Sequence, residues 1–184
     1  KSINDLKEYL TADAKNYKAP NKIFLKGIRT RLYLNPICDQ RYIWKYISSL
    51  RHLEYHINNH GILHKIFRIY YLYLLRKYSY KTGFQIPPNV CDAGITIWHW
   101  GPIIVNQNVR IGKNVTLYPG VLIGWKSANM PCPVIGDNVF IGSGVKIIGN
   151  VHVGDNAIIG QNCVISKDVQ SNCVVVSSKN RVLD

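Results

Sequence analysis

Residues 135–164 read IGDNVF-IGSGVK-IIGNVH-VGDNAI-IGQNCV, five consecutive units of six residues that each begin with isoleucine or valine. The same period continues on both sides of this stretch, with one pause after residue 123. The aliphatic positions are Val105, Ile111, Leu117, Ile123, Ile135, Ile141, Ile147, Val153, Ile159 and Ile165. A period of six fits neither an α-helix nor a β-hairpin, so it indicates short strands that repeat around a coil.

The residues between the aliphatic positions favour the same fold. Glycine follows the aliphatic residue in six units, and asparagine or aspartate is common after the glycine. These residues adopt positive φ at low cost and therefore turn the chain between short strands. Three such strands close a triangular coil, and stacked coils bury the aliphatic residues inside a prism. Small or β-branched residues fill the space beside them, and Cys163 is expected to be one of these packing residues.

The first 82 residues differ in composition from the repeat region. They hold 16 Lys and Arg against 5 Asp and Glu, a net charge of +11, and 11 of the 12 tyrosines. Residues 83–184 have a net charge of +2 and hold 12 of the 14 glycines. We therefore expect an α-helical N-terminal region over residues 1–82 and a β-helix domain with a C-terminal tail over residues 83–184.

Helical spacing of apolar residues divides the first region into four predicted helices. They run from Ser2 to Pro20, from Asn21 to Asn35, from Asp39 to Ile57 and over Ile62–Tyr80. Ser2 and Asp5 stand in the positions of a capping box. The last helix is apolar or aromatic apart from a basic stripe, so it is either buried on most sides or lies on a membrane surface.

The basic charge allows several partners. The basic side chains can simply face solvent, or they can bind an anionic membrane or an acidic polymer. No nucleic-acid-binding motif is present. His52, His56, His60 and His64 are four residues apart, but Gly61 interrupts a shared helix, so we do not expect a metal there. Five cysteines without a CxxC pair and no visible signal peptide lead us to expect a reduced, cytoplasmic protein, with peripheral contact at the inner membrane face as an option.

The repeat resembles the left-handed parallel β-helix of the hexapeptide-repeat acyltransferases, over about residues 84–184. A helical part ahead of such a β-helix is similar to serine O-acetyltransferases and to small O-acetyltransferases of bacterial surface-polysaccharide pathways. The resemblance implies a mainly β protein that forms a homotrimer or a dimer of trimers. It also implies that acetyl-CoA, as co-substrate, lies in the groove between neighbouring prisms.

His99 is the predicted catalytic residue. It stands in GITIWHWGPIIV, residues 94–105. This stretch holds two residues more than the six-residue period allows, just before the regular run begins, so it should bulge from a corner of the prism. By the resemblance, His99 matches the general base of the serine enzymes. A neutral imidazole takes the proton of an acceptor hydroxyl as its oxygen attacks a thioester, and then returns the proton to the leaving thiolate.

Several positions depart from the serine enzymes. Trp98 replaces an aspartate, and Cys132 replaces a second histidine. Gln85 or Asp92 is the candidate to orient His99. Trp98 and Trp100, with Tyr118, form the predicted acceptor site, since flat apolar faces suit a sugar ring; packing at a subunit interface is the other interpretation of the tryptophans.

The cofactor positions follow from the resemblance to sugar O-acetyltransferases. The residues that match acetyl-CoA contacts are Ser143, Gln161, Ser166, Lys167 and Arg181. Lys167 and Arg181 bring positive charge to the expected position of the 3′-phosphate. The insertion over residues 125–134 should project as a loop over the neighbouring subunit's site.

The leading hypothesis is an acetyl-CoA-dependent O-acetyltransferase that acts on a sugar hydroxyl of a surface polysaccharide or its precursor, without a metal. Serine O-acetyltransferase is the alternative enzyme. A non-catalytic β-helix scaffold is the alternative of another class.

Overall fold

The computed structural model describes residues 2–16, 40–127 and 130–177. The described helices are α1 (Ile3–Asn16), α3 (Gln40–Ile57) and α4 (Ile62–Thr82). The helix expected between Asn21 and Asn35, and the expected start at Asp39, lie outside the described residues. The capping box at the first helix is confirmed, because the Ser2 amide donates to Asp5 Oδ2 at 2.6 Å and the Asp5 amide donates to Ser2 Oγ at 3.1 Å.

Helix α4 extends two residues beyond the predicted end at Tyr80. Gly83 ends it in the left-handed conformation, with a φ of 82°, and donates its N–H to the carbonyl of Ser79 at 2.8 Å. Glycine favours this conformation because it lacks a Cβ atom. The chain then passes directly into the first strand.

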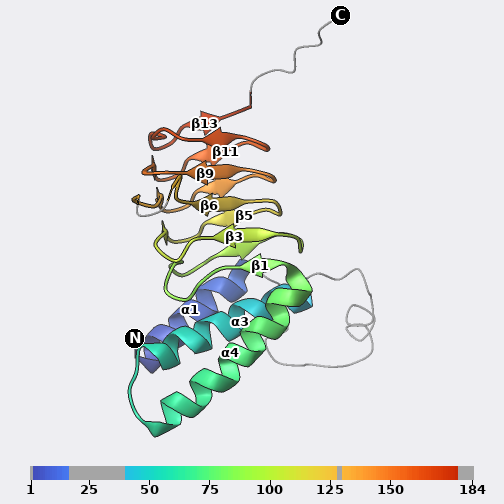
Figure 1. Cartoon of the computed structure of the whole chain (residues 1–184), viewed down its shortest axis with the longest axis vertical. Coiled ribbons are helices and arrows are strands. Elements are labelled where there is room, and N and C mark those ends of the chain that lie inside the picture. Colours follow the sequence, from blue (N-terminus) through green and yellow to red (C-terminus); the bar gives the residue numbers. More distant parts are fainter. Residues whose placement is uncertain (1, 17–39, 128–129, 178–184) are drawn as a thin grey trace, which may run out of the picture.

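Thirteen short strands follow the helices within the described part of the chain. They are β1 (Phe84–Gln85), β2 (Thr96–Ile97), β3 (Ile103–Val105), β4 (Arg110–Ile111), β5 (Thr116–Leu117), β6 (Leu122–Gly124), β7 (Val134–Ile135), β8 (Phe140–Ile141), β9 (Lys146–Ile148), β10 (His152–Val153), β11 (Ile158–Ile159), β12 (Val164–Ile165) and β13 (Val174–Val175). All strand pairs are parallel, and the strands stack as the coils of a prism above the helices (Figure 1). The parallel β-helix predicted from the six-residue period is confirmed.

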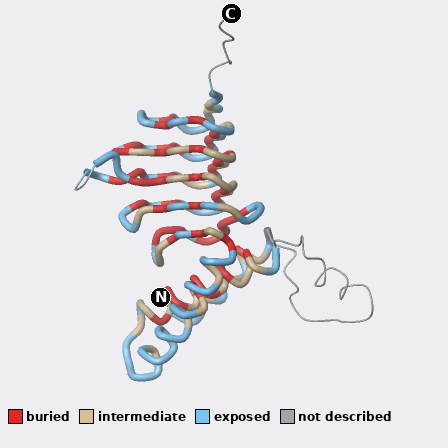
Figure 2. Tube along the Cα trace, turned by 45° about the vertical axis from the view of Figure 1, so that its right-hand side comes forward, coloured by how far each residue is buried: buried red, intermediate tan, exposed pale blue. Residues whose placement is uncertain are grey.

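Three sheets form the three sides of the prism. Sheet A has the order β1-β3-β6-β9-β12, sheet B the order β10-β7-β4 and sheet C the order β13-β11-β8-β5-β2. The chain visits sheets A, B and C in turn, so each coil has an A–B corner, a B–C corner and a C–A corner. The ten aliphatic repeat residues are all buried inside this prism (Figure 2).

An asparagine ladder holds the B–C corner. Asn114, Asn138, Asn156 and Asn172 each have a φ between 54° and 62° and lie one above the other. The side-chain amides of the first three each donate to the side-chain carbonyl of the next asparagine, at 3.1 to 3.2 Å. Asparagine tolerates the left-handed conformation and satisfies its own polar side chain in this stack. This explains why asparagine recurs in the sequence.

The helices close the lower end of the prism. Tyr46 of α3 is buried and makes two hydrogen bonds with the backbone of Ile86, at 3.0 and 3.1 Å. Its ring packs edge-on against Phe84 of the first strand. None of the described helices combines the length and apolar character needed to cross a bilayer.

A buried ion network joins α1, α3 and the first coil. Arg51 of α3 donates to Asp13 at 2.7 Å and to Glu54 at 3.1 Å, and all three side chains are buried. Arg51 also donates to the backbone carbonyls of Cys91 and Asp92, at 2.8 and 2.7 Å. Every one of these contacts satisfies a charge or a carbonyl that has left water.

Asp13 is the point where α1 meets the prism. Its Oδ1 accepts the backbone N–H groups of Gly94 and Ile95, at 2.7 and 3.0 Å. Burial raises the pKa of Asp13, opposed by Arg51 and by these two N–H groups. The acidic neighbours Asp13 and Glu54 outweigh burial at Arg51 and raise its pKa, so the guanidinium stays charged.

We predict that Arg51→Met lowers the free energy of unfolding by about 3–5 kcal/mol, because it leaves two carboxyl groups buried without their partner. Lys7→Met, at an exposed position on α1, should change it by less than about 0.5 kcal/mol. Urea unfolding followed by circular dichroism measures both. Equal losses in the two variants would show that the network does not hold the helices to the prism.

Candidate active site

His99 lies at the C–A corner of the first complete coil, between β2 and β3. It is exposed and has a φ of 64°, a left-handed value that is uncommon for residues other than glycine. Gly101, two residues later, has a φ of 142°, and a Cβ atom there would lie 2.9 Å from Cβ of Pro119. The two extra residues therefore make a tight bulge, as predicted, that displays the imidazole.

Besides Trp100, the same corner carries four other predicted site residues. Trp98 and Tyr118 follow paired strands, and the Trp98 amide donates to the carbonyl of Leu117 at 3.2 Å. One coil further, Ser143 Oγ donates to the carbonyl of Pro119 at 2.9 Å. Gln161 follows in the next coil. We call the line of Trp98, His99, Tyr118, Ser143 and Gln161 the His99 ridge.

The two tryptophans flank His99 and differ in their packing. Trp98 is 37% exposed and Trp100 is 40% exposed. The ring of Trp100 stacks on Tyr42 of α3, with 6.1 Å between centroids, and Lys81 of α4 lies 4.8 Å from the centre of the Tyr42 ring. Trp100 thus ties the His99 bulge to the helices and has one face occupied.

The two residues proposed to orient His99 lie in different places. Gln85 is exposed on β1, whose partner strand β3 follows the His99 bulge. Asp92 lies at the B–C corner, away from the His99 ridge, and accepts a hydrogen bond from Tyr9 Oη at 2.8 Å. Burial, and secondly the hydrogen bond to Asp92 and its charge, raise the pKa of Tyr9 to about 12. Within one copy of the chain, Gln85 therefore remains the candidate and Asp92 does not.

The other cofactor positions lie at the A–B corner. Ser166 and Lys167 follow β12 of sheet A and precede Val169, which bridges to Val153 of sheet B. Arg181 lies outside the described residues. Sheet A separates Lys167 from the His99 ridge, so one copy does not bring them together.

The insertion joins β6 of sheet A to β7 of sheet B, so its described residues lie at the A–B corner. Cys132 lies near the end of this insertion and is buried beside Asn106, with 3.5 Å between its Sγ and Asn106 Oδ1. Burial raises the pKa of the Cys132 thiol, so it is a poor nucleophile. It does not lie on the His99 ridge.

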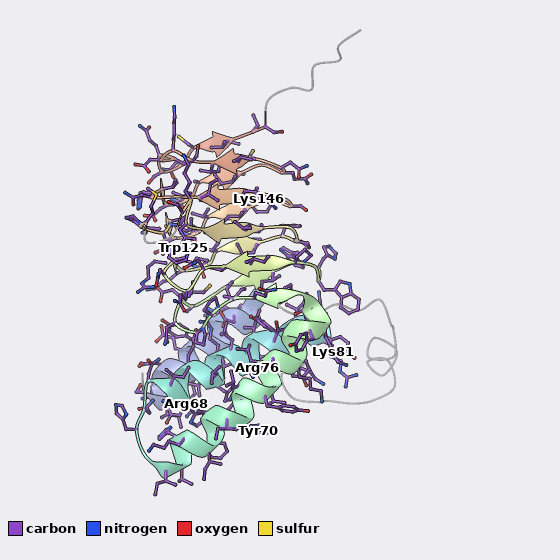
Figure 3. The ribbon with its side chains drawn as sticks, viewed as in Figure 1. Arg68, Tyr70, Arg76, Lys81, Trp125 and Lys146 are labelled. Carbon is purple, nitrogen blue, oxygen red and sulfur yellow. The ribbon has the colours of Figure 1, made fainter. Side chains whose placement is uncertain are left out.

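Lys146 is a candidate that sequence reasoning missed. It lies on sheet A next to the C–A corner, where its ammonium donates to the carbonyl of Gly120 (Figure 3). Its partners along the sheet are Leu122 and Val164, both aliphatic. A lysine at a repeat position that is aliphatic in the coils above and below could have identified this residue from the sequence. Lys146 places a positive charge beside Ser143.

The histidines of the helical region form a pair rather than a row of four. Nδ1 of His56 lies 2.9 Å from Nδ1 of His64, and burial lowers the pKa of His56, with His64 adding to the effect. Among the described residues, no three acidic, histidine or cysteine side chains are placed to share a metal ion.

Comparisons with known proteins agree with the fold. Residues 132–167 match the family described as bacterial transferase hexapeptide (six repeats). This part of the β-helix is therefore similar to the hexapeptide repeats of that family. A serine acetyltransferase structure from Entamoeba histolytica in complex with cysteine superposes with a TM-score of 0.68 at 20% identity, over 99% of this chain and 62% of that one. The β-helix is therefore of the left-handed type seen in that family.

Two curated relatives differ in the acceptor that their names imply. The serine acetyltransferase of Staphylococcus xylosus is 33% identical over 132 residues, 68% of this chain and 61% of that protein. The "Putative colanic acid biosynthesis acetyltransferase WcaB" of Escherichia coli K12 is 43% identical over 88 residues, 47% of this chain and 54% of that protein. The chain thus spans little more than half the length of these relatives.

Proposed function

We propose that this chain is an O-acetyltransferase that takes its acetyl group from acetyl-CoA. The observation that carries the proposal is the His99 ridge, on which an exposed imidazole is aligned with Ser143 and Gln161, the positions that match acetyl-CoA contacts. Lys146 adds a positive charge beside this line. These residues fit a long, anionic ligand that lies along the prism axis.

His99 moves one proton in the proposed reaction. Acetyl-CoA supplies an acetyl group that is activated by its thioester. The imidazole accepts the proton of the acceptor hydroxyl while the new C–O bond forms and the C–S bond breaks. It then gives this proton to the leaving sulfur, so no covalent acyl-enzyme is needed. Gln85 is the proposed orienting residue.

A second copy of the chain would complete the site. Exposed aliphatic side chains lie on both sheets that meet at the His99 ridge: Ile104 and Val164 on sheet A, Ile158 and Val174 on sheet C. Their burial between copies would remove apolar surface from water. A homotrimer of this kind would also allow Lys167 of one copy to approach His99 of the next, which the single prism does not.

The comparisons favour serine as the acceptor over the sugar hydroxyl expected from the sequence. Most of the relatives, and the structural neighbours, are named serine acetyltransferases. The sugar remains the second candidate, because Trp98 offers an exposed aromatic face where a carboxylate would be needed to hold the ammonium of serine, and because the relative with 43% identity is named for a polysaccharide pathway.

We predict that His99→Ala lowers the rate of acetyl transfer by roughly 10²–10⁴, the usual contribution of a general base. Release of the CoA thiol measures the rate, and size-exclusion chromatography checks that the assembly is unchanged. His152→Ala, at the exposed second histidine of the prism, is the matched control and should keep full activity. Full activity of the His99 variant would remove this residue from the mechanism, and no thiol release by the native chain would favour a scaffold.

The charge on Lys167 predicts recognition of the 3′-phosphate of CoA. Lys167→Ala should weaken acetyl-CoA binding by about 10- to 100-fold, as expected for the loss of one charged hydrogen bond. It should weaken binding of the 3′-dephospho analogue much less. Arg181→Ala is expected to behave in the same way. Isothermal titration calorimetry compares the two ligands, and equal losses for both would contradict a contact with this phosphate.

An acceptor assay separates the two candidates. If serine is the acceptor, we expect saturable acetylation of L-serine. The rate of this reaction should change by less than about threefold in Trp98→Ala, because serine has no apolar face to stack on the ring. A requirement for glycan acceptors, with a KM that rises in Trp98→Ala while acetyl-CoA affinity is unchanged, would replace serine by a sugar. Mass spectrometry of the products identifies the acceptor in either case.

A further inference from the structure

Helix α4 exposes far more apolar surface than a solvated helix needs. Its inner side packs on α3, where Leu75 and Thr82 are buried. Its outer side carries Ile62, Ile69 and Tyr80, which are 78%, 71% and 88% exposed. Contiguous apolar surface of this kind on a soluble protein marks a binding face.

The exposed residues form one continuous stripe. At 100° per residue, Ile62, Ile66, Ile69, Tyr73 and Tyr80 fall within about 60° of each other on the helix. Lys65 and Arg76 lie along one side of the stripe and Lys77 along the other. We call this surface the α4 outer face. It is roughly 27 Å long, from its first isoleucine to its last tyrosine.

The charges decide what can cover this face. Helix α4 contains five Lys and Arg residues and no Asp or Glu. A second copy packed face to face would bring two sets of positive charges together, which is unfavourable. Anionic lipid headgroups are complementary to the basic flanks, and the hydrocarbon below them accepts the isoleucines. Tyrosine prefers the boundary between the two.

A hollow at the start of α4 has the same character. Asn59, His60, Lys65 and Arg68 line it together with Gly61 and Ile62, and its volume is about 340 Å³. It contains two cationic side chains and no acidic one. Figure 3 shows Arg68 near this end of the helix and Arg76 and Lys81 further along it, so basic side chains accompany α4 over most of its length.

We propose that the α4 outer face binds the surface of a membrane that contains anionic lipids. The helix lies in the plane of the interface, with the isoleucines among the acyl chains and the basic side chains at the phosphates. This binding is independent of the proposed enzymatic activity.

The far end of α4 leads to the His99 bulge. The carbonyl of Thr82 accepts the N–H of Gly101 at 2.8 Å, and Lys81 lies over the Tyr42 ring that stacks on Trp100. If the proposed function holds, a membrane-bound helix would keep the acetyl acceptor site at a short, fixed distance from lipid headgroups. This placement would favour the second candidate acceptor, a sugar hydroxyl carried on a membrane lipid, over free serine.

Co-sedimentation of the full chain with lipid vesicles tests the proposal. We expect binding to vesicles of phosphatidylcholine with phosphatidylglycerol and much weaker binding to phosphatidylcholine alone. The triple variant Ile66→Ser, Ile69→Ser, Tyr73→Ser should lose at least tenfold in affinity. The triple variant Lys65→Gln, Arg76→Gln, Lys77→Gln should lose roughly 100-fold on the anionic vesicles, at about fivefold for each charge.

Two control variants match the test variants. Lys7→Gln, Lys113→Gln, Lys126→Gln removes the same charge from exposed positions elsewhere, and Ile3→Ser removes an exposed isoleucine from α1. Both should bind the anionic vesicles nearly as well as the native chain. Circular dichroism checks the fold of every variant.

Three results would overturn the proposal. The first is absence of binding by the native chain to the anionic vesicles. The second is equal binding by the native chain and both α4 variants. The third is self-association without lipid, seen in sedimentation velocity, that the α4 variants abolish, because the face would then be a protein interface. Since the assay needs no acetyl-CoA, its failure is distinct from failure of the proposed activity.

Discussion

The buried guanidinium of Arg51 fixes the helices to the β-helix. It forms ion pairs with Asp13 and Glu54 and donates to two carbonyl groups of the first coil, while Asp13 accepts two backbone N–H groups of the same coil. A charge buried at this depth is tolerated only when all its partners are in place. The positions of α1, α3 and α4 relative to the prism, and with them the support of Trp100 by Tyr42, depend on this network.

The fold could be predicted from the sequence because every coil of a β-helix requires the same residue types at the same positions, which gives the sequence a six-residue period. Each coil needs an aliphatic residue at the same point, and residues such as Asn114 and Asn138 recur where the corner requires positive φ. The helix ends were harder to predict. Tyr80 was expected to be the last helical residue, whereas Gly83 supplies a left-handed cap that lets α4 reach Thr82.

The site could be predicted in part for the same reason. The period places Ser143 and Gln161 above His99 once the strand register is known. The contact between Trp100 and Tyr42 joins residues 58 positions apart, so no local sequence pattern could predict it. The bond between Asp92 and Tyr9 likewise required the position of α1. His99 and Lys167 were both predicted from the sequence, but sheet A separates them in one prism, so the proposed site with both residues requires a second copy.

The most direct test of the account is a crystal structure of the chain with CoA. We predict that CoA lies along the His99 ridge between two copies, with its sulfur about 3–4 Å from the imidazole of His99 and its pantetheine beside Ser143. A CoA molecule bound elsewhere, for example in the hollow beside Tyr9 and Asp92, with His99 facing solvent, would contradict the account.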